Sequence, residues 1–267
     1  AGTGLSSHEL NMPGAYKEVK DTTVVALFKV IKNEQSSFLF DDANEDVRIA
    51  AWTTTPWTLP SNTALSAGPD ISYIKIKTSN PYTHTPVSVV LAEALVPNWF
   101  GGKNQSTVEG QSAAFKGSKM KGIRYEPLLD FGNEIEPLLG GTDAYLVLTG
   151  DHVTTSDGTG IVHTAPSFGA DDQRVAKANG VGTLTLVDQT GKFKENVGPY
   201  SGRYVKDYKD EPGYVAVDID IAIQLKTEGK ALNVQKYEHN YPHCWRTDKP
   251  VLYYPMDSWF IKSTACK

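Results

Sequence analysis

The chain has 267 residues, of which 40% are hydrophobic, and this is enough to bury the core of one large domain or two small ones. Its formal net charge of −5 comes from 26 basic and 31 acidic residues and excludes a protein that coats a nucleic-acid duplex with its whole surface. Two cysteines argue against a disulfide framework and fit a reducing compartment, and no apolar run reaches the ~20 residues of a membrane span.

The first part of the chain predicts strands that are separated by turns. The opening at residues 2–20 is polar and turn-rich and is expected to be a connector. Runs of β-branched and apolar residues predict strands at 22–31, 47–53 and 71–78. A further apolar run starts at Val87 and is expected to pass into a short helix over 91–96, which Pro97 helps to end. Residues 100–122 are rich in Gly, Ser and Lys and are expected to form a loop.

The second part of the chain predicts both strands and helices. Strands are predicted at 144–148, 160–163 and 183–187. Residues 171–179 are compatible with a helix, for which Gly180 is a natural C-terminal stop. The first half of 217–226 alternates like a strand, but its Ala-Ile-Gln-Leu run and the stop at Gly229 favour a helix. Residues 233–262 are rich in aromatic side chains and predict an extended ribbon.

This order of elements favours a β-rich α/β fold, with a barrel-like sheet, small peripheral helices and extended connecting ribbons at both ends. The sequence contains neither a G-x-G-x-x-G motif nor a Walker-type phosphate loop, so a Rossmann or P-loop fold is not predicted. A G-x-S-x-G nucleophile elbow is also missing, which excludes serine-hydrolase chemistry of that type.

A run of threonines leaves the predicted strand at 47–53 and meets a proline. The segment reads Trp52-Thr53-Thr54-Thr55-Pro56-Trp57-Thr58-Leu59-Pro60-Ser61-Asn62. Pro56 keeps Thr55 out of the helical conformation, so the hydroxyls would project from extended backbone and line a small polar pocket. The alternative is a strand end whose threonines reflect β propensity alone. The two Trp and two Pro residues around the run favour the pocket.

A second segment combines glycines, a histidine and two carboxylates. It reads Gly158-Thr159-Gly160-Ile161-Val162-His163-Thr164-Ala165-Pro166-Ser167-Phe168-Gly169-Ala170-Asp171-Asp172. The glycines permit tight turns around a short buried strand, which would end at His163. An Asp at the start of the following helix is favoured as a cap, and this structural role fits Asp171 better than Asp172. A carboxylate at the edge of a pocket would instead bind an ammonium group.

Two weaker patterns have plain structural alternatives. His239, His243 and Cys244 have metal-binding side chains, but no second Cys or His pair completes four ligands, so zinc is not predicted. A basic cluster is formed by Lys116, Lys119, Lys121 and Arg124. It would suit a local nucleic-acid contact, but a solvated, lysine-rich loop is the favoured explanation.

The threonine segment and the histidine segment together resemble the isoleucyl-tRNA synthetases. The editing insertion of that family carries W-T-T-T-P-W-T-L-P-x-N and then G-T-G-I/V-V-H-x-A-P-x-F/H-G-x-D/E-D, and both patterns are present here in that order. The tail at Tyr241–Arg246 and Ser258–Phe260 is similar to the strand by which the insertion returns to the catalytic core. The resemblance covers nearly the whole chain.

Specific positions separate this family from its relatives. The leucyl and valyl enzymes share the fold, but they typically carry Arg where Thr55 stands and do not usually carry His where His163 stands. Two departures from the family pattern are local. Asp171 replaces the commoner Glu, and the segment 208–220 is unusual, which puts the local fold before the return strand in question.

The resemblance implies a pocket that admits a valyl group and excludes the longer isoleucyl group. His163 would supply the steric gate alongside Thr53 and Thr55, and Asp172 would bind the α-ammonium group of the substrate. The terminal adenosine, the ester carbonyl or the attacking water would be positioned by Thr54, Thr55, Thr58 and Asn62. The pKa range of histidine would suit a general base, but the resemblance casts His163 as an element of shape and hydrogen bonding. The residues predicted to act in catalysis are Thr54, Thr55, His163 and Asp172.

The implied function is hydrolytic proofreading of valyl-tRNA(Ile) by an aminoacyl-tRNA ester hydrolase, as part of an isoleucyl-tRNA synthetase. The same pocket would also suit valyl-adenylate, and the alternative is a tRNA acceptor-end binding module that is inactive outside the full synthetase. The expected partners are the 3′ acceptor end of tRNA(Ile) with its valine and the catalytic domain of the parent enzyme, with no membrane. No metal or cofactor is expected, because ATP would be used only by that catalytic domain.

The chain is predicted to have three parts. These are an incoming connector at 1–21, the editing domain at 22–232 and a return ribbon at 233–267. The chain lacks an initiator Met and a closing signal, so we expect an excised fragment of a longer protein. No signal peptide is recognised at its start, so a cytoplasmic location is expected. Its length and its pattern of inserts favour a eukaryote-like cytoplasmic enzyme.

Overall fold

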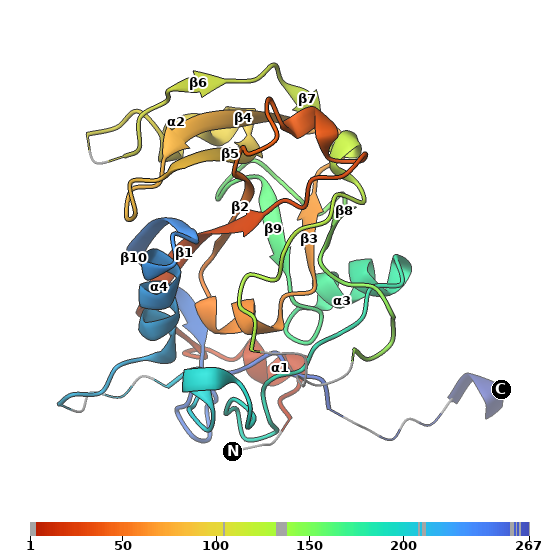
Figure 1. Ribbon diagram of the computed structural model, residues 1–267. Coiled ribbons are helices and arrows are strands. Elements are labelled where there is room, and N and C mark those ends of the chain that lie inside the picture. The colour runs from red at the N-terminus through yellow and green to blue at the C-terminus, as the bar shows by residue number, and fades with distance from the viewer. Residues whose placement is uncertain are drawn as a thin grey trace.

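The computed structural model describes residues 4–103, 105–131, 138–207, 209, 212–256, 259, 261 and 263–266, and within them it shows a ten-stranded mixed sheet with short helices (Figure 1). The predicted β-rich α/β class is therefore confirmed. The strands are β1 (Tyr16–Lys29), β2 (Val47–Thr53), β3 (Ala64–Ala67), β4 (Ser72–Ser79), β5 (Pro86–Ala92), β6 (Gly110–Gln111), β7 (Phe115–Lys116), β8 (Leu146–Thr149), β9 (Ile161–Thr164) and β10 (Ala231–Pro242).

The α-helices are α1 (Ser7–Leu10), α2 (Val96–Trp99), α3 (Ala170–Ala178) and α4 (Val217–Thr227). The 3-10 turns are η1 (Ser37–Leu39), η2 (Pro56–Ser61), η3 (Glu93–Leu95), η4 (Gly117–Met120), η5 (Gly198–Tyr200) and η6 (Ser263–Cys266). None of the helices in the described ranges combines the length and apolarity that crossing a bilayer requires.

Strand β2 is the branch point of the sheet. One of its edges pairs antiparallel with β1. Its other edge pairs parallel with β5 through Val47 to Ile49 and then with β9 at Trp52. Beyond β9 follow β3 and β8, so the sheet divides beside β2 into an upper arm with β4 and β5 and a lower arm with β9, β3 and β8 (Figure 1). The residues that follow β2 consequently lie beside those of β9.

The apolar run that predicted the first strand is explained by burial on both faces. Val24 and Phe28 of β1 pack into the main core cluster, whereas Val25 and Leu27 pack into a second cluster on the other face. A strand that is covered on both faces reads as a continuous apolar run without alternation. Helix α4 covers the main cluster with side chains such as Ile221, which is fully buried.

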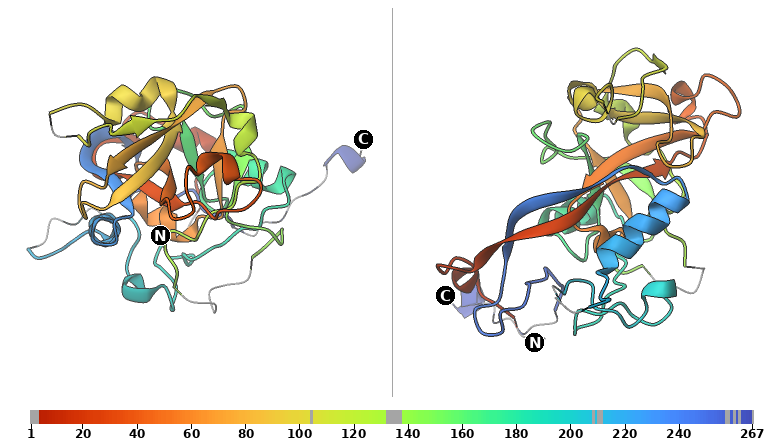
Figure 2. Two further views of the ribbon diagram at one scale, coloured as in Figure 1. Left: turned by 45° about the horizontal axis from the view of Figure 1, so that its top comes forward. Right: turned by 90° about the vertical axis from the view of Figure 1, so that its left-hand side faces the viewer.

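Strands β1 and β10 continue beyond the body of the sheet as a two-stranded ribbon (Figure 2). Their pairing runs from Tyr16 opposite Pro242 to Ala26 opposite Ala231. The predicted boundaries after residues 21 and 232 both lie within this pairing, and the division into three parts stays a prediction. The extended, aromatic-rich character predicted from residue 233 onward is confirmed for β10.

The helix predicted over 91–96 is wrong. Strand β5 continues to Ala92, a 3-10 turn follows, and α2 begins at Val96. Pro97 lies in the first turn of α2 and does not end a helix. Proline is favoured in the first turn of a helix, because the N–H group that it lacks would have no helical partner there. Pro97 therefore marks the start of a helix and not its end.

Three other sequence-based assignments also need correction. The connector predicted at 2–20 contains α1 and the beginning of β1, and the loop predicted at 100–122 contains β6, β7 and η4. The strand predicted at 183–187 forms only isolated bridges, between Thr183 and Leu139 and between Val187 and Phe193. Its apolar residues are used for packing, since Leu184 and Leu186 belong to the main core cluster.

The two longer helices were predicted correctly from their end signals. Helix α3 stops before Gly180, whose φ of 68° is available to glycine at little cost. Helix α4 stops before Gly229, whose φ is 66°. Residues 217–226 therefore form a helix, as the stop at Gly229 indicated, and not a strand.

A buried tyrosine ties the upper arm of the sheet to the glycine turn before β9, and its removal should destabilise the protein. The Tyr73 hydroxyl accepts a bond from Gly68 N at 2.9 Å and donates to Gly160 O at 2.6 Å. Tyr73→Phe should lower the free energy of unfolding by about 1–3 kcal/mol, because both backbone groups lose their partner. Urea unfolding measures this, with Tyr253→Phe at a half-exposed ring as the control. Equal stability of the two variants would contradict the prediction.

Candidate functional site

The threonine segment begins as a tight polar turn at the end of β2. Thr55 N donates to the Thr53 hydroxyl at 3.1 Å, and the hydroxyl oxygens of Thr53 and Thr55 lie 3.3 Å apart. Thr55 has a φ of −131° and a ψ of 71°, outside the helical region, as expected before Pro56. The strand ends at Thr53, as its predicted bounds gave, but the hydroxyls of Thr53 and Thr55 lie in a turn and not on the extended backbone that was predicted.

The segment then continues as the 3-10 turn η2, all six residues of which are buried. Thr58 is bonded to Thr55 O through its backbone N at 3.0 Å and through its hydroxyl at 2.9 Å. Asn62 follows the turn, and its backbone N donates to Leu59 O at 3.1 Å. A buried turn has few ways to satisfy its backbone groups, so these local bonds fix the orientation of Thr58 and Asn62.

His163 lies on β9 and connects the two motifs. Its Nε2 is 2.9 Å from the Thr58 hydroxyl, and its Nδ1 is 2.8 Å from the side-chain nitrogen of Asn62. That Asn62 nitrogen also donates to Ala64 O at 2.8 Å, which fixes the orientation of the amide. The amide oxygen accepts from the Tyr125 hydroxyl at 2.7 Å.

These contacts assign a direction to every bond around the imidazole. Asn62 must donate to Nδ1, so the proton of a neutral His163 is on Nε2 and is donated to Thr58. The Thr58 hydroxyl in turn donates a hydrogen bond to Thr55 O. Both ring nitrogens are therefore occupied, and His163 has no free lone pair with which to accept a proton from water.

The electrostatics of His163 agree with this assignment. The side chain is buried, and burial lowers its pKa from 6.5 to about 3. The folded protein thus keeps the ring neutral where the unfolded chain binds a proton. This difference removes stability as the pH falls from about 6.5 to about 3 and has no effect above that range.

Asp172 lies in the first turn of α3 and faces back toward the end of β9. Its Oδ2 accepts from Ala165 N at 2.8 Å, two residues after His163. Burial raises the pKa of this carboxyl, while the bond from Ala165 and the nearby His152 act in the opposite direction. The carboxylate is therefore short of compensating charge, and a cationic group beside it would stabilise it.

The structure corrects the capping assignment of the two aspartates. The N-cap residue of α3 is Gly169, and it makes no side-chain cap. Asp171 is exposed and pairs with Arg174 at 3.2 Å. Gly169 instead lies against Asp172, since a Cβ on the glycine would meet Asp172 Cγ at 3.1 Å. The small residue leaves room for that carboxylate beside the turn.

The predicted site residues are brought together in two groups. Hydrogen bonds link a first group around the end of β2, namely Thr53, Thr55, Thr58, Asn62 and His163. Asp172 joins β9 two residues after His163. Thr54 is half-buried and lies outside this hydrogen-bonded chain. The roles assigned to these residues stay predictions, whereas their proximity is now a structural fact.

Three residues of this region were missed by the sequence reasoning. Tyr125 anchors the Asn62 amide, and Asp218 accepts from Trp57 N at 2.8 Å. Both ring nitrogens of His152 are buried without a hydrogen-bond partner near Asp172. No local pattern points to these positions, because each reaches the site from a distant part of the sequence.

The weaker sequence patterns have structural explanations. His239 contacts Asp21 at 2.9 Å, and His243 Nδ1 lies 2.9 Å from Tyr241 O. In the described ranges, no cluster of His, Cys, Asp and Glu side chains has the size of a metal site. Of the basic cluster, Arg124 pairs with Asp143, and Lys116 donates to Asp70 O.

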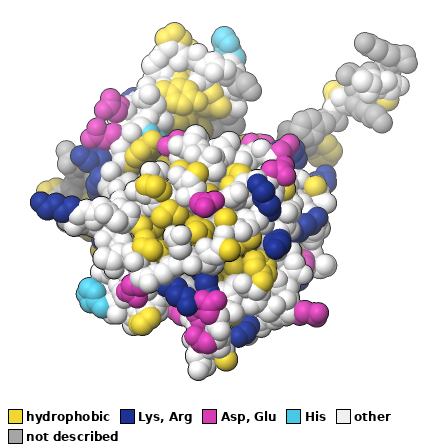
Figure 3. Space-filling view, turned by 90° about the horizontal axis from the view of Figure 1, so that it is seen from above, with side chains coloured by type: hydrophobic (Ala, Val, Ile, Leu, Met, Phe, Trp, Pro, Cys, Tyr) yellow, Lys and Arg dark blue, Asp and Glu magenta, His cyan; other side chains and the backbone are white. Residues whose placement is uncertain are grey.

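Two surface hollows lie away from this site. One is lined by Asn33, Glu34, Gln35, Phe38 and Lys119, and another of about 210 Å³ is lined by Lys17, Asp207, His243, Asp248, Lys249 and Pro250. Neither contains a member of the His163 network. The described part of the face seen from above mixes basic and acidic side chains around scattered apolar ones (Figure 3). The candidate site is the polar network around His163, because it brings hydroxyl, imidazole and amide groups together.

Comparison with known sequences shows relatives along the whole chain. Isoleucine–tRNA ligases of Porphyromonas gingivalis and Cytophaga hutchinsonii are 44% and 46% identical to it, and the matches cover 100% of this chain. The chain spans only 26% of the length of each relative. No protein-family model matches the chain. The expectation of a eukaryote-like enzyme is corrected, because these relatives are bacterial.

Comparison with solved structures shows a common fold. The GlLeuRS-CP1 structure has a TM-score of 0.56 at 15% identity, and the match covers 80% of this chain and 98% of that chain. The editing domain of the cytosolic leucyl-tRNA synthetase from P. falciparum has a TM-score of 0.53 at 10% identity, with 80% and 99% covered. At these identities the similarity establishes the fold alone.

The hydrogen-bond network predicts the protonation state of His163. The ring should carry its proton on Nε2 and stay neutral at every pH above about 5, because its pKa is about 3. Long-range proton–nitrogen NMR spectra measure both properties, and the spectrum of His163→Gln assigns the signals. A ring that titrates between about pH 5 and 7, or that is protonated on Nδ1, would rule out the network.

Proposed function

The whole chain is homologous to a segment of bacterial isoleucyl-tRNA synthetases, and from this premise we propose that it hydrolyses wrongly charged valyl-tRNA(Ile). The single observation that supports the reaction best is the joining of the threonine turn, His163 and Asp172 at the ends of β2 and β9. The proposal includes the 3′ acceptor end of tRNA(Ile) and the rest of the synthetase as partners, in the cytoplasm.

The chemistry of the two amino acids explains the need for a second site. Valine differs from isoleucine by one methylene, and an apolar pocket gains only ~1–3 kcal/mol from such a group, for which the isoleucyl enzyme is itself the standard example. A separate hydrolytic pocket that rejects the larger side chain increases the discrimination. The buried imidazole of His163 is suited to this role, since Thr58 and Asn62 hold its position.

Each group of the site has a task in the proposed reaction. The Asp172 carboxylate binds the α-ammonium group of the aminoacyl ester, and the charge-assisted contact orients it. The hydroxyls of the threonine turn position the ester carbonyl, the terminal adenosine or a water molecule. The water oxygen attacks the carbonyl carbon, the bond to the ribose oxygen breaks, and that oxygen takes up a proton to leave valine and free tRNA.

The protein need not supply a nucleophile for this reaction, because an aminoacyl ester is already activated and a well-placed water gains much of the rate from proximity. We assign no general base among the side chains. His163 is unsuited to that task, because Asn62 occupies the one nitrogen that could accept a proton. No cofactor or metal enters the proposal.

The direct test is hydrolysis of valyl-tRNA(Ile) and isoleucyl-tRNA(Ile) that were charged beforehand. Preferential release of valine supports the proposal. Tight tRNA binding without release from either substrate favours an acceptor-end binding module that depends on the rest of the synthetase. Release of valine from valyl-adenylate, measured in parallel, decides whether the adenylate is also a substrate.

Neutralising Asp172 should weaken the hydrolysis of valyl-tRNA. Asp172→Asn keeps an acceptor for Ala165 N but loses the charge that binds the ammonium, so kcat/KM should fall by about tenfold or more. Burial raises the pKa of Asp172, so the carboxylate gains its proton at a higher pH than an ordinary aspartate. As the pH is lowered, the activity of the unaltered chain should therefore begin to fall above the pH range in which aspartate ordinarily titrates. The matched control is Asp171→Asn at the exposed neighbour. Equal rates for the two variants would remove Asp172 from the site.

Removing the imidazole of His163 should open the sieve. His163→Ala should release isoleucine from isoleucyl-tRNA(Ile), so the preference for valine should fall by about tenfold or more. The control is His84→Ala, which alters an exposed histidine in the turn between β4 and β5. An unchanged preference in folded His163→Ala would show that another group excludes isoleucine.

A further inference from the structure

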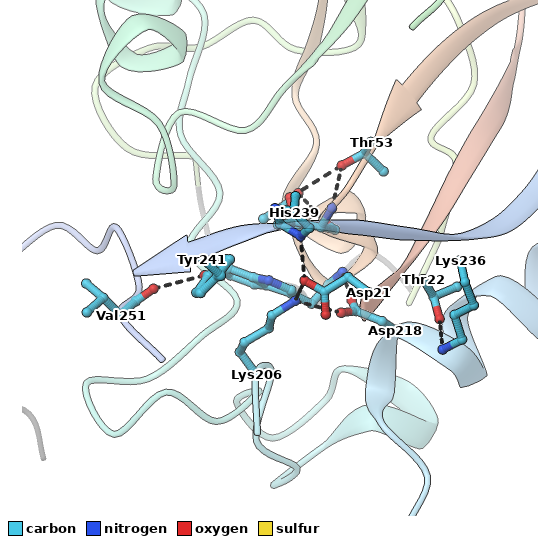
Figure 4. Close-up of polar contacts among 12 residues, drawn as sticks. Asp21, Thr22, Thr53, Lys206, Asp218, Lys236, His239, Tyr241 and Val251 are labelled. Atoms are coloured by element: carbon cyan, nitrogen blue, oxygen red, sulfur yellow. Dashed lines mark hydrogen bonds and ion pairs between the residues drawn. The ribbon is translucent and has the colours of Figure 1, made fainter. Parts of the chain in front are cut away.

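A cluster of polar and charged side chains around Lys206 contacts η2 through Asp218 (Figure 4). Lys206 Nζ is 2.6 Å from Asp21 Oδ2 and 3.5 Å from Asp218 Oδ2. His239 Nε2 is 2.9 Å from the same Asp21 oxygen, and the Lys206 Nζ lies 4.9 Å from the centre of the Tyr241 ring. Asp21, Lys206 and Asp218 are each at most 8% exposed. The cluster joins the ribbon of β1 and β10 to the start of α4.

One atom of this cluster acts on the candidate site. Asp218 Oδ1 accepts from Trp57 N at 2.8 Å, and Trp57 lies between Pro56 and Thr58. The first N–H groups of a helical turn have no partner within it. Pro56 has no N–H, and Thr55 supplies no side-chain cap to η2. Asp218 therefore provides from α4 the cap that the turn lacks locally.

The position of this cap matters because the turn carries the site. Thr55 and Thr58 lie directly on either side of Pro56 and Trp57, and Thr58 holds the imidazole of His163. A shift of the first turn of η2 would move both hydroxyls and the ring together. The turn is short and contains Pro60, so the contact to Asp218 adds an anchor from outside to its few internal bonds.

The charges around Asp218 explain how a buried carboxylate can serve as this cap. Burial raises the pKa of Asp218 to about 6, although the nearby Lys206 and the bond from Trp57 lower it. Asp21 shares Lys206 and in turn contacts His239 on the ribbon. A buried carboxylate without such a partner would be strongly disfavoured. Lys206 thus keeps Asp218 in place as a fixed acceptor.

We propose that Asp218, held by Lys206, is a positioning residue of the hydrolytic site, which fixes the first turn of η2 and thereby the orientation of Thr55, Thr58 and His163. This inference rests on the proposed function and adds to it a residue outside both sequence motifs. Asp218 does not touch the substrate in this proposal, because it is buried behind the turn.

The test compares three variants of this chain. Asp218→Ala removes the acceptor, and Asp218→Asn keeps an oxygen for Trp57 N without the charge. Ile221→Ala is the matched control, since Ile221 is fully buried in the same helix and packs into the core without a polar contact to η2. Two quantities are measured below the unfolding temperature of each variant. They are backbone hydrogen exchange over residues 53–62 and the single-turnover rate of valyl-tRNA hydrolysis at saturating protein.

If Asp218 positions the turn, hydrogen exchange over residues 53–62 should be faster in Asp218→Ala than in Ile221→Ala. The rate of valyl-tRNA hydrolysis by Asp218→Ala should fall about 10- to 100-fold, because the site is misplaced. Asp218→Asn should recover most of both. Exchange over 53–62 that is unchanged in Asp218→Ala, or raised equally by Ile221→Ala, overturns the proposal. If the unaltered chain does not hydrolyse valyl-tRNA, the proposed function fails, while hydrogen exchange still decides whether Asp218 positions the turn.

Discussion

Strand β2 pairs with two neighbours in succession along one edge, first β5 and then β9, while β1 holds its other edge. This divided pairing brings the end of β2 beside β9, and therefore brings the threonine turn beside His163. The main core forms around the same strands, and α4 closes it. Residues far apart in the sequence can meet at one point because the sheet divides there.

The site at this point depends on polar groups that are satisfied almost entirely by one another. Tyr125, Asn62, His163 and Thr58 form one directed series of hydrogen bonds that ends at the backbone of Thr55. Each member is buried, so the loss of one partner would leave an unpaired group in an apolar environment. Such a series is rigid, which suits a pocket that must distinguish side chains by size. Asp172 differs, because its carboxylate has one backbone partner and is poised to accept a cation.

Further contacts link η2 to α4 and to the ribbon of β1 and β10. The ribbon of β1 and β10 contributes the buried Asp21 and the neighbouring His239, and α4 contributes Asp218, which accepts from Trp57 in η2. A continuous set of contacts thus leads from the ribbon to η2 (Figure 4). The chain spans about a quarter of the length of the isoleucine–tRNA ligases to which it is similar.

The sequence by itself determined the elements whose signals are local. Strand β2 ends shortly before Pro56, and the two longer helices end before Gly180 and Gly229. The continuous apolar run in β1 indicated a buried strand. The two motifs also identified the residues that now lie together. Only the tertiary structure decided the partners. The hydrogen bonds that Tyr125 donates to Asn62 and that Asp218 accepts from Trp57 join residues far apart in the sequence, and no local pattern encodes them. For the same reason the apolar run at 183–187 became core packing, since the described residues pair with it only through isolated bridges at Thr183 and Val187.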